Sequence, residues 1–183
     1  WAGGPLLVSS GIGPFNEDGL DRLTSGRVIN MTFDVTDNAF VLRSTTRAAD
    51  LADQLTLFAQ QLANPRWDPA PIGRAKAALL ASYDSTDASA QSVLGRDMAR
   101  LLHGGDWRWA TPDKAAIDAL TPAAFRKAWE PILKQGKVEL LVFGDAERAD
   151  VIKAISESLG ALPKRKEAKI KPAFAMTKGP QPT

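Results

Sequence analysis

The single histidine of this 183-residue chain, His103, is the natural starting point, because histidine is the commonest acid–base group and metal ligand. A catalytic zinc site usually takes three protein ligands, often with two histidines on one helix, and this chain cannot supply that pair. His103 follows an apolar helical stretch and precedes Gly104 and Gly105, which is typical of a helix C-terminus. The pattern therefore predicts that His103 ends a helix, and we assign it no catalytic or metal-binding role.

Nucleophiles and phosphate-binding loops are equally scarce. The chain has no cysteine, which removes thiolate nucleophiles, disulfides and cysteine zinc sites together. Ser9 and Ser10 lie outside any G-x-S-x-G pattern, and a serine nucleophile needs an organised base. The stretch GIGPFN fails the dinucleotide fingerprint because Asn16 takes the place of the third glycine, and no P-loop lysine follows.

One asparagine and three acidic residues cluster at Asn16, Glu17, Asp18 and Asp21, which invites a calcium-site interpretation. An EF-hand loop counted from Asn16 needs a glutamate at its twelfth position, where this chain has Arg27. We therefore interpret the cluster as the capped start of a helix.

Two further groups of side chains are of residue types that could bind or act on a ligand. Asp84 and Asp87, three residues apart on an expected helix, have the types of a glycosidase carboxylate pair, although a solvated helix surface explains them as well. Trp107 and Trp109 flank Arg108 and have the makeup of a ligand-stacking site, but aromatic residues after a helix more often cap a core. The sequence thus predicts no catalytic residue and no metal ligand, and it leaves substrate-binding residues unknown.

The positive charge of the chain is concentrated at its C-terminus. Residues 164–183 hold six Lys or Arg residues and one Glu, so they carry +5, whereas the whole chain carries +2 and residues 1–163 therefore −3. A basic segment with several prolines is typical of a solvated linker or tail. Phosphate contact by this tail, in a nucleic-acid-binding module, remains a weaker alternative.

The hydrophobic pattern changes period along the chain. A short helix over 16–26 leads to alternating apolar residues over 27–35 and 40–46, which predict a β-hairpin with its turn at 36–39. Segment 137–145 is apolar on both faces and predicts a central strand. Helical spacing recurs in the other segments: 45–65, two segments within 67–105, 111–120, 121–133 and 147–163.

These elements predict an α+β fold. Its expected form is a two-layer sandwich, with helices packed on one face of a mainly antiparallel sheet, because helices outnumber strands and the clearest strands form a hairpin. We expect a single domain over residues 1–163, followed by the basic segment 164–183. No apolar run reaches membrane-spanning length and the stretch WAGGPLLVSS lacks the basic flank of a signal peptide, so we expect a soluble fragment of unknown compartment.

The order of four motifs resembles the pitrilysin/insulinase family of zinc metallopeptidases. These are the Leu-x-x-Pro helix end at 62–65, the Leu-Thr-Pro-x-x-Phe helix start at 120–125, the segment ending in Gly-Asp at 138–145, and Gly-x-Leu-Pro at 160–163. The resemblance covers about residues 15–163. It implies the metallopeptidase-like domain fold of that family, with zinc bound by an H-x-x-E-H helix early in active domains.

This chain departs from the family at that point, because its early helix over 16–26 contains no histidine. The resemblance therefore implies a non-catalytic homologous domain from a C-terminal half, which walls a peptide-binding chamber and contacts homologous domains. Zinc is then expected in a separate catalytic domain, of the same polypeptide or a partner subunit, and this chain alone is expected to be inactive. The alternative is a non-peptidase structural or assembly subunit of the same fold.

Overall fold

A computed structural model describes residues 1–36, 39–86 and 88–167, without the side chains of Pro5 and Asp84. It divides into two compact units, which we describe separately. The sheet unit comprises residues 2–72 and 121–167, and the helical unit comprises residues 73–120. Residues 168–183, most of the expected tail, lie outside the described part.

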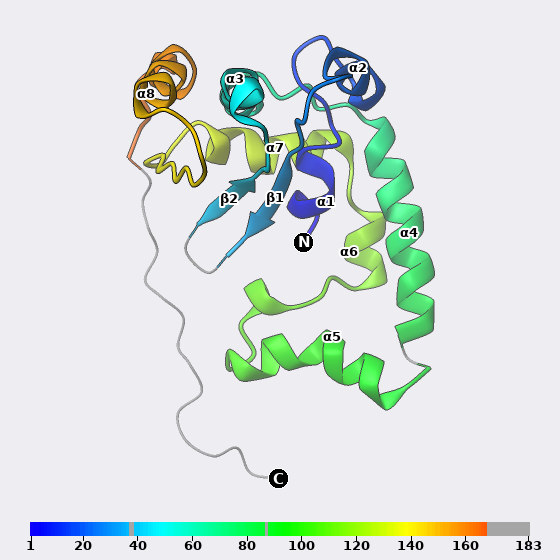
Figure 1. Ribbon diagram of the computed structural model, residues 1–183. Coiled ribbons are helices and arrows are strands. Elements are labelled where there is room, and N and C mark those ends of the chain that lie inside the picture. The colour runs from blue at the N-terminus through cyan, green and yellow to red at the C-terminus, as the bar shows by residue number, and fades with distance from the viewer. Residues whose placement is uncertain (37–38, 87, 168–183) are drawn as a thin grey trace. The chain divides into compact units, whose positions relative to one another are not determined.

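The sheet unit combines a two-stranded sheet with helices (Figure 1). Its elements are α1 (Gly3–Leu7), α2 (Glu17–Leu23), β1 (Thr32–Val35), β2 (Phe40–Arg43), a 3-10 turn (Ala48–Asp50), α3 (Leu51–Ala63), α7 (Pro122–Leu133), α8 (Arg148–Glu157) and a 3-10 turn (Leu159–Ala161). The predicted α+β class and the predicted antiparallel hairpin are therefore confirmed.

The hairpin has one apolar and one charged face. β1 and β2 pair antiparallel, with Phe33 opposite Leu42 and Asp34 opposite Val41. Phe33 is buried, whereas Asp34 reaches across the other face to Arg43, 3.0 Å away. This alternation is what a strand with period two requires, so the sequence pattern located the buried face correctly.

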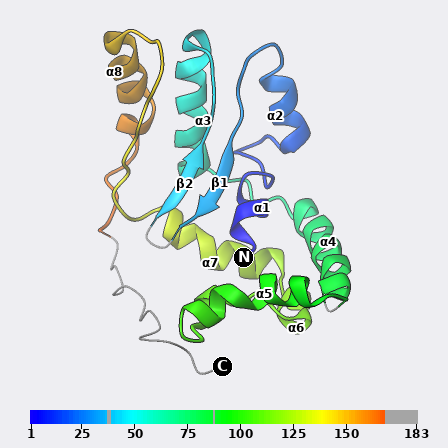
Figure 2. The same ribbon diagram turned by 60° about the horizontal axis from the view of Figure 1, so that its bottom comes forward.

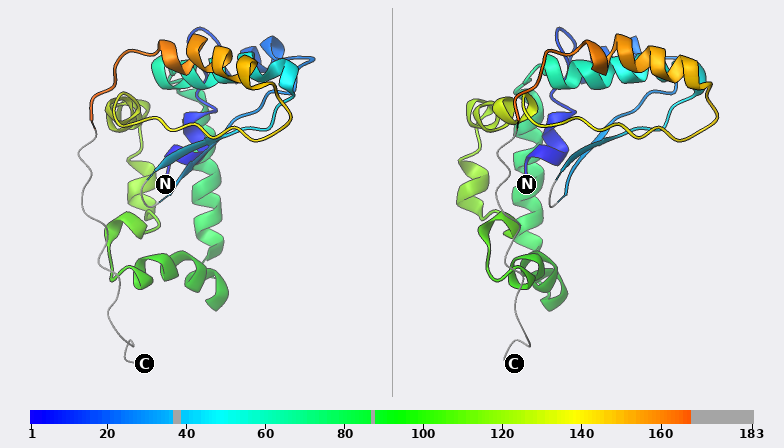
Figure 3. Two further views of the ribbon diagram at one scale, coloured as in Figure 1. Left: turned by 60° about the vertical axis from the view of Figure 1, so that its left-hand side comes forward. Right: turned by 90° about the vertical axis from the view of Figure 1, so that its left-hand side faces the viewer.

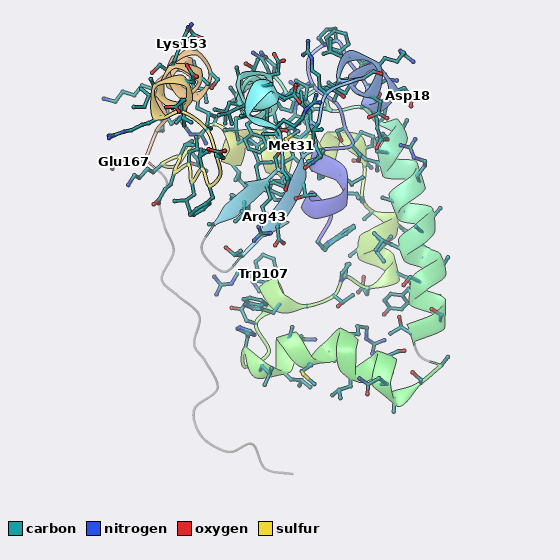
Figure 4. All side chains as sticks on the ribbon, in the orientation of Figure 1. Asp18, Met31, Arg43, Trp107, Lys153 and Glu167 are labelled. Atoms are coloured by element: carbon teal, nitrogen blue, oxygen red, sulfur yellow. The ribbon has the colours of Figure 1, made fainter. Side chains whose placement is uncertain are left out.

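Two small clusters form the core of the sheet unit. In the first, Leu7, Phe33 and Leu133 bring α1, β1 and α7 together, and Trp129 packs edge-on against Phe33 at 5.4 Å between ring centroids. In the second, three buried residues join α3 to α8: Leu55, Phe58 and Ala154. Figure 2 shows α3 and α8 beside each other, next to β2. Met31, before β1, packs against the second cluster, whereas Lys153 on α8 points away from it (Figure 4).

Helix α1 is an element that the sequence did not predict. Its sequence, Gly-Gly-Pro-Leu-Leu, has poor helix propensity, yet Leu6 and Leu7 are fully buried. Tertiary packing outweighs the poor helix propensity of this segment. Gly3 lies directly against the indole of Trp129, where a Cβ atom would overlap the ring. The carbonyl of Leu7 accepts a hydrogen bond from Gln61 Nε2 at 3.0 Å, which ties α1 to α3.

The predicted central strand over 137–145 is wrong. Residues 137–147 form an extended segment between α7 and α8 that belongs to neither strand of the hairpin. Its large apolar side chains remain exposed, with Leu141 72% and Phe143 87% accessible. An apolar sequence supplies the side chains of a buried strand, but it becomes one only where neighbouring strands pair with its backbone.

The helical unit contains the remaining elements, α4 (Ala70–Thr86), α5 (Ala90–Leu102), a 3-10 turn (Trp107–Trp109) and α6 (Lys114–Asp118); α4 starts just before the unit does. Both helices expected within 67–105 are present. Helix α6 is shorter than the expected helical segment 111–120 and starts later, because its N-cap is Asp113, which accepts from Ala116 N at 2.7 Å. No helix of the described residues is long and apolar enough to cross a bilayer.

Candidate functional site

His103 lies at the end of α5, as the sequence predicts. It is the C-cap residue of that helix, and its Nδ1 lies 2.7 Å from the carbonyl oxygen of Ala99. Its imidazole stacks on Trp109 with 3.8 Å between ring centroids and 10° between the planes. One ring nitrogen and one ring face are thus engaged in closing the turn after α5.

Two charged residues that follow His103 stabilise the 3-10 turn after α5. Asp106 caps the 3-10 turn by accepting from Arg108 N at 3.0 Å, and it binds the Arg108 guanidinium through both carboxylate oxygens. These hydrogen bonds from Arg108 lower the pKa of Asp106 to about 2. Asp106 is therefore ionised at neutral pH and does not carry the proton that a general acid needs.

The described side chains form no donor set for a zinc ion. Within the part of the chain that the structure describes, no three His, Cys, Asp or Glu side chains are grouped as metal ligands. The most buried carboxylate, Asp50, accepts hydrogen bonds from Val28 N at 2.9 Å and Arg47 Nε at 2.7 Å. It holds the loop before β1 against the start of α3, so its oxygens are used structurally.

The other sequence candidates are dispersed. Asn16 caps α2 by accepting from Gly19 N at 3.0 Å, which agrees with its interpretation as a helix start. Ser10 is buried, and its hydroxyl donates to Leu6 O at 2.5 Å. Trp107 is 79% exposed and caps no core among the described residues. The aspartate pair, Asp84 and Asp87, lies outside the described residues and side chains.

A groove of about 310 Å³ in the sheet unit is the feature that sequence reasoning missed. It lies between the end of β2, helix α3 and the extended segment before α8. Figure 3 shows that segment running beside β2 in the same direction, each followed by a helix that folds back over it. The groove is lined by residues 44–48 and 140–146, together with Leu51, Gln54, Leu55 and Phe58.

Two buried polar atoms in this groove have no hydrogen-bond partner among the described residues, Ser44 Oγ and Gln54 Nε2. The Gln54 side chain is only 1% exposed, and its other terminal atom, Oε1, accepts from Asn30 N at 3.2 Å. Buried polar groups are nearly always paired, so each unpaired atom calls for an explanation. The only hint in the sequence is a glutamine at a core-facing position of an amphipathic helix.

Comparison with known proteins identifies the fold. No protein-family model matches the chain, and no curated protein sequence matches it. Among solved structures, a mutant of the ferredoxin protease FusC in complex with Arabidopsis ferredoxin superposes on 93% of this chain, with a TM-score of 0.72 and 18% identity. The periplasmic protease PqqL from Escherichia coli superposes on 92% of it, with a TM-score of 0.64 and 13% identity.

This chain spans 19% of the FusC chain and 20% of the PqqL chain, so it corresponds to about a fifth of either protein. Both proteins are peptidases of the pitrilysin/insulinase family. Their similarity extends over nearly all of the chain, across elements whose order the sequence motifs had indicated. The chain therefore has the fold of a pitrilysin/insulinase-type peptidase domain.

Proposed function

We propose that this chain is a non-catalytic domain of a pitrilysin-like zinc peptidase. In the intact protein it would wall the chamber that encloses a peptide and contact the homologous domains around it. Zinc and the residues that activate water would belong to another domain. This division of labour is consistent with a chain that spans about a fifth of two solved peptidases.

The observation that carries the proposal is the position of the one histidine. An active domain of this fold needs two histidines and a glutamate on one helix, and a sequence with a single histidine cannot supply them. His103 is moreover bonded to Ala99 and stacked on Trp109 at the end of α5. The sheet unit, which includes the early helices α1 and α2, contains no histidine.

Peptide cleavage tests the proposal directly. The purified chain is incubated with a library of quenched fluorescent peptides, with and without added zinc, next to an active pitrilysin-family enzyme as positive control. We expect no turnover by the chain above the buffer rate under either condition, because it lacks the ligand set for a hydrolytic zinc.

A His103→Ala variant distinguishes genuine activity from contamination. Zinc-dependent cleavage that the wild-type chain performs and this variant loses would contradict the proposal. Cleavage of equal rate in both preparations would instead identify a contaminating peptidase, since that activity does not depend on the only imidazole of the chain.

A further inference from the structure

Helix α5 of the helical unit exposes its apolar side. No residue of this helix is buried. Its large apolar residues on one side are between 41% and 63% exposed: Leu94, Met98, Leu101 and Leu102. A helix of about this length is marginally stable in water by itself, and burial of its apolar face normally supplies the missing stability. The face that would normally be buried against a core therefore lies on the surface.

The polar side of α5 is the side that packs within its own unit. The side chain of Arg96 is only 21% exposed, and its guanidinium carbon lies 5.9 Å from the centre of the Tyr83 ring on α4. The carbonyl oxygen of Arg96 accepts a hydrogen bond from the Thr111 hydroxyl at 3.1 Å. Polar contacts thus fix the orientation of α5, and this orientation directs its apolar side outward.

The rest of the helical unit has little core of its own. Among its described residues, only Ile117 is buried. Residues 73–120 hold six Lys or Arg residues and six Asp residues, so this unit carries no net charge. Two copies of it would therefore approach each other without strong electrostatic repulsion.

A glycine in the middle of α5 indicates the kind of surface that fits there. Gly95 lowers the helix propensity relative to alanine. A Cβ atom at this position would have no neighbour within 4 Å, so packing against the described residues does not require a glycine. Gly95 lies at the edge of the apolar side, two turns before Leu102. The missing side chain there allows another helix to approach closely.

The spacing of the apolar residues matches that of a helix–helix seam. Leu94, Met98 and Leu101 are separated by four and three residues, the pattern with which identical helices pair. We propose that α5 is a dimerisation helix that pairs antiparallel with α5 of a second copy of this chain. Met98 of each copy then packs against Leu101 of the other.

The antiparallel direction follows from the residues beside the seam. In this arrangement Leu102 of each copy covers Gly95 of the other, so the gap at the glycine is filled. Parallel pairing would instead place Leu102 beside Asp97 of the other copy, which brings an apolar side chain against a charge. Antiparallel helix dipoles also attract each other, whereas parallel dipoles repel.

The available area suits a weak and reversible dimer. The exposed parts of the four apolar side chains amount to on the order of 400 Å² per copy, and the residues around them enlarge the contact to the size of transient interfaces. We expect a dissociation constant on the order of 10–100 µM. Pairing through α5 does not depend on peptide cleavage or on its absence, so failure of this proposal leaves the proposed function untouched.

Sedimentation equilibrium of the full chain between about 2 and 500 µM is the first test, and we expect a reversible monomer–dimer equilibrium. Leu101→Lys puts two like charges into the seam and should weaken association at least tenfold. Ser92→Lys is the matched control, because it adds the same charge to the exposed opposite side of α5, and it should associate like the wild type. Since Leu101 is already 63% exposed, the monomeric Leu101→Lys variant should keep the wild-type circular dichroism spectrum.

Gly95→Ala separates association from helix stability. Alanine has the higher helix propensity, so the dilute, monomeric variant should unfold at the wild-type temperature or above it. The added Cβ takes the space that Leu102 of the second copy would fill, so association should weaken about fivefold or more. A residue important only for the fold of one copy would not move these two measurements in opposite directions.

Cysteine cross-linking tests the direction of pairing, because the chain has no cysteine of its own. Met98→Cys and Leu101→Cys chains, one of them carrying a size tag, are mixed and mildly oxidised. We expect a disulfide between the two variants, since facing positions of a helix seam lie within disulfide reach. Leu94→Cys alone should not cross-link, whereas parallel helices would link it to its own copy.

Three results would overturn the proposal. These are a chain that stays monomeric up to about 1 mM, a dimer that neither Leu101→Lys nor Gly95→Ala weakens, and cross-linking of Leu94→Cys to itself in place of the mixed pair. If a monomeric chain begins to dimerise when residues 168–183 are deleted, the chain's own C-terminal segment competes for α5. If it stays monomeric after that deletion, α5 does not bind a second copy and its apolar side is left to a different protein.

Discussion

Buried polar side chains in the sheet unit mostly bind main-chain groups, which explains why so many candidate residues yield no reactive pair. Asp50 accepts from Val28 N, Ser10 donates to Leu6 O, and Gln61 donates to Leu7 O. The bonds to Val28 N and Leu7 O satisfy backbone groups that a loop or short helix leaves without a backbone partner, whereas Leu6 O also accepts from Ser10 N at 3.0 Å. A polar residue engaged in this way is structural, even where its type suits catalysis.

Asp50 should make folding sensitive to acid. The hydrogen bond from Arg47, followed by that from Val28 N, lowers the pKa of Asp50 below its ordinary value. A carboxylate with a depressed pKa in the folded state stabilises the fold above its unfolded pKa, and this contribution disappears as pH falls through the folded value. We expect Asp50→Asn to lower the thermal midpoint at pH 7 and to reduce its decline between about pH 5 and pH 3.

Asp53→Asn is the matched control for thermal unfolding followed by circular dichroism. Asp53 lies one turn further along and pairs with Arg27 at 2.8 Å, but both side chains are about half exposed. Surface ion pairs contribute little, so this variant should keep the wild-type midpoint at pH 7. Equal effects of the two substitutions would refute the role of Asp50.

At the scale of elements, close packing and caps decide where helices begin and how they meet. α7 starts as its sequence predicts, with Thr121 accepting from Ala124 N at 3.1 Å and Pro122 in the first turn. α6 follows the same Thr-Pro signal, yet Asp113 two residues later takes the cap. The Thr111 hydroxyl instead donates to Arg96 O at 3.1 Å.

Thr121→Ala should destabilise the fold by about 1 kcal/mol, because it removes the side-chain oxygen that accepts from the first turn of α7. Thr121→Ser, which keeps that oxygen, should retain most of the stability. Urea unfolding monitored by circular dichroism measures both. If the alanine and serine variants unfold at the same urea concentration, the Thr121 side chain does not act as the N-cap of α7.

Gly3→Ala tests the packing of α1 against α7. A Cβ at Gly3 would overlap the Trp129 ring, so we expect a loss on the order of 1–3 kcal/mol as the ring or helix shifts. Gly4→Ala is the neighbouring control, because its Cβ would meet only Phe33 O at 3.8 Å, an ordinary contact.

Denaturant midpoints of the two alanine variants give the comparison. Gly4→Ala should be neutral or mildly stabilising, since alanine has the higher helix propensity. A Gly3→Ala variant as stable as Gly4→Ala would show that α1 does not pack on Trp129 as described. Adding Trp129→Phe to Gly3→Ala should recover part of the loss, as expected for residues in contact.

For the whole molecule, the prediction that the chain lacks a zinc-ligand set has a thermodynamic consequence. A metal that binds only the folded state raises the thermal midpoint in proportion to the logarithm of its concentration. With one histidine and no cysteine in the chain, we expect neither zinc nor EDTA to shift the midpoint measured by calorimetry. A rise of several degrees with zinc that EDTA reverses would require a metal site and would contradict the proposed function.

Much of the local structure was predictable. The period-two pattern identified the hairpin, and capping residues with helical spacing identified α2, α3, α7 and α8 within a few residues. These signals are local, because a cap or an amphipathic face is a property of neighbouring residues. The position of His103 was predictable from a local signal too, because glycines that follow an apolar helix mark the end of that helix wherever it lies in the fold.

The sequence by itself thus determined the α+β class, the hairpin, most helices and the place of its one histidine at the end of a helix. Only the tertiary structure decided that Gly-Gly-Pro-Leu-Leu forms a helix, because burial against Trp129 outweighs its poor propensity. Tertiary structure also decided that segment 137–145 does not form a strand. A strand depends on hydrogen bonds to residues distant in the chain, so its apolar pattern alone cannot specify it.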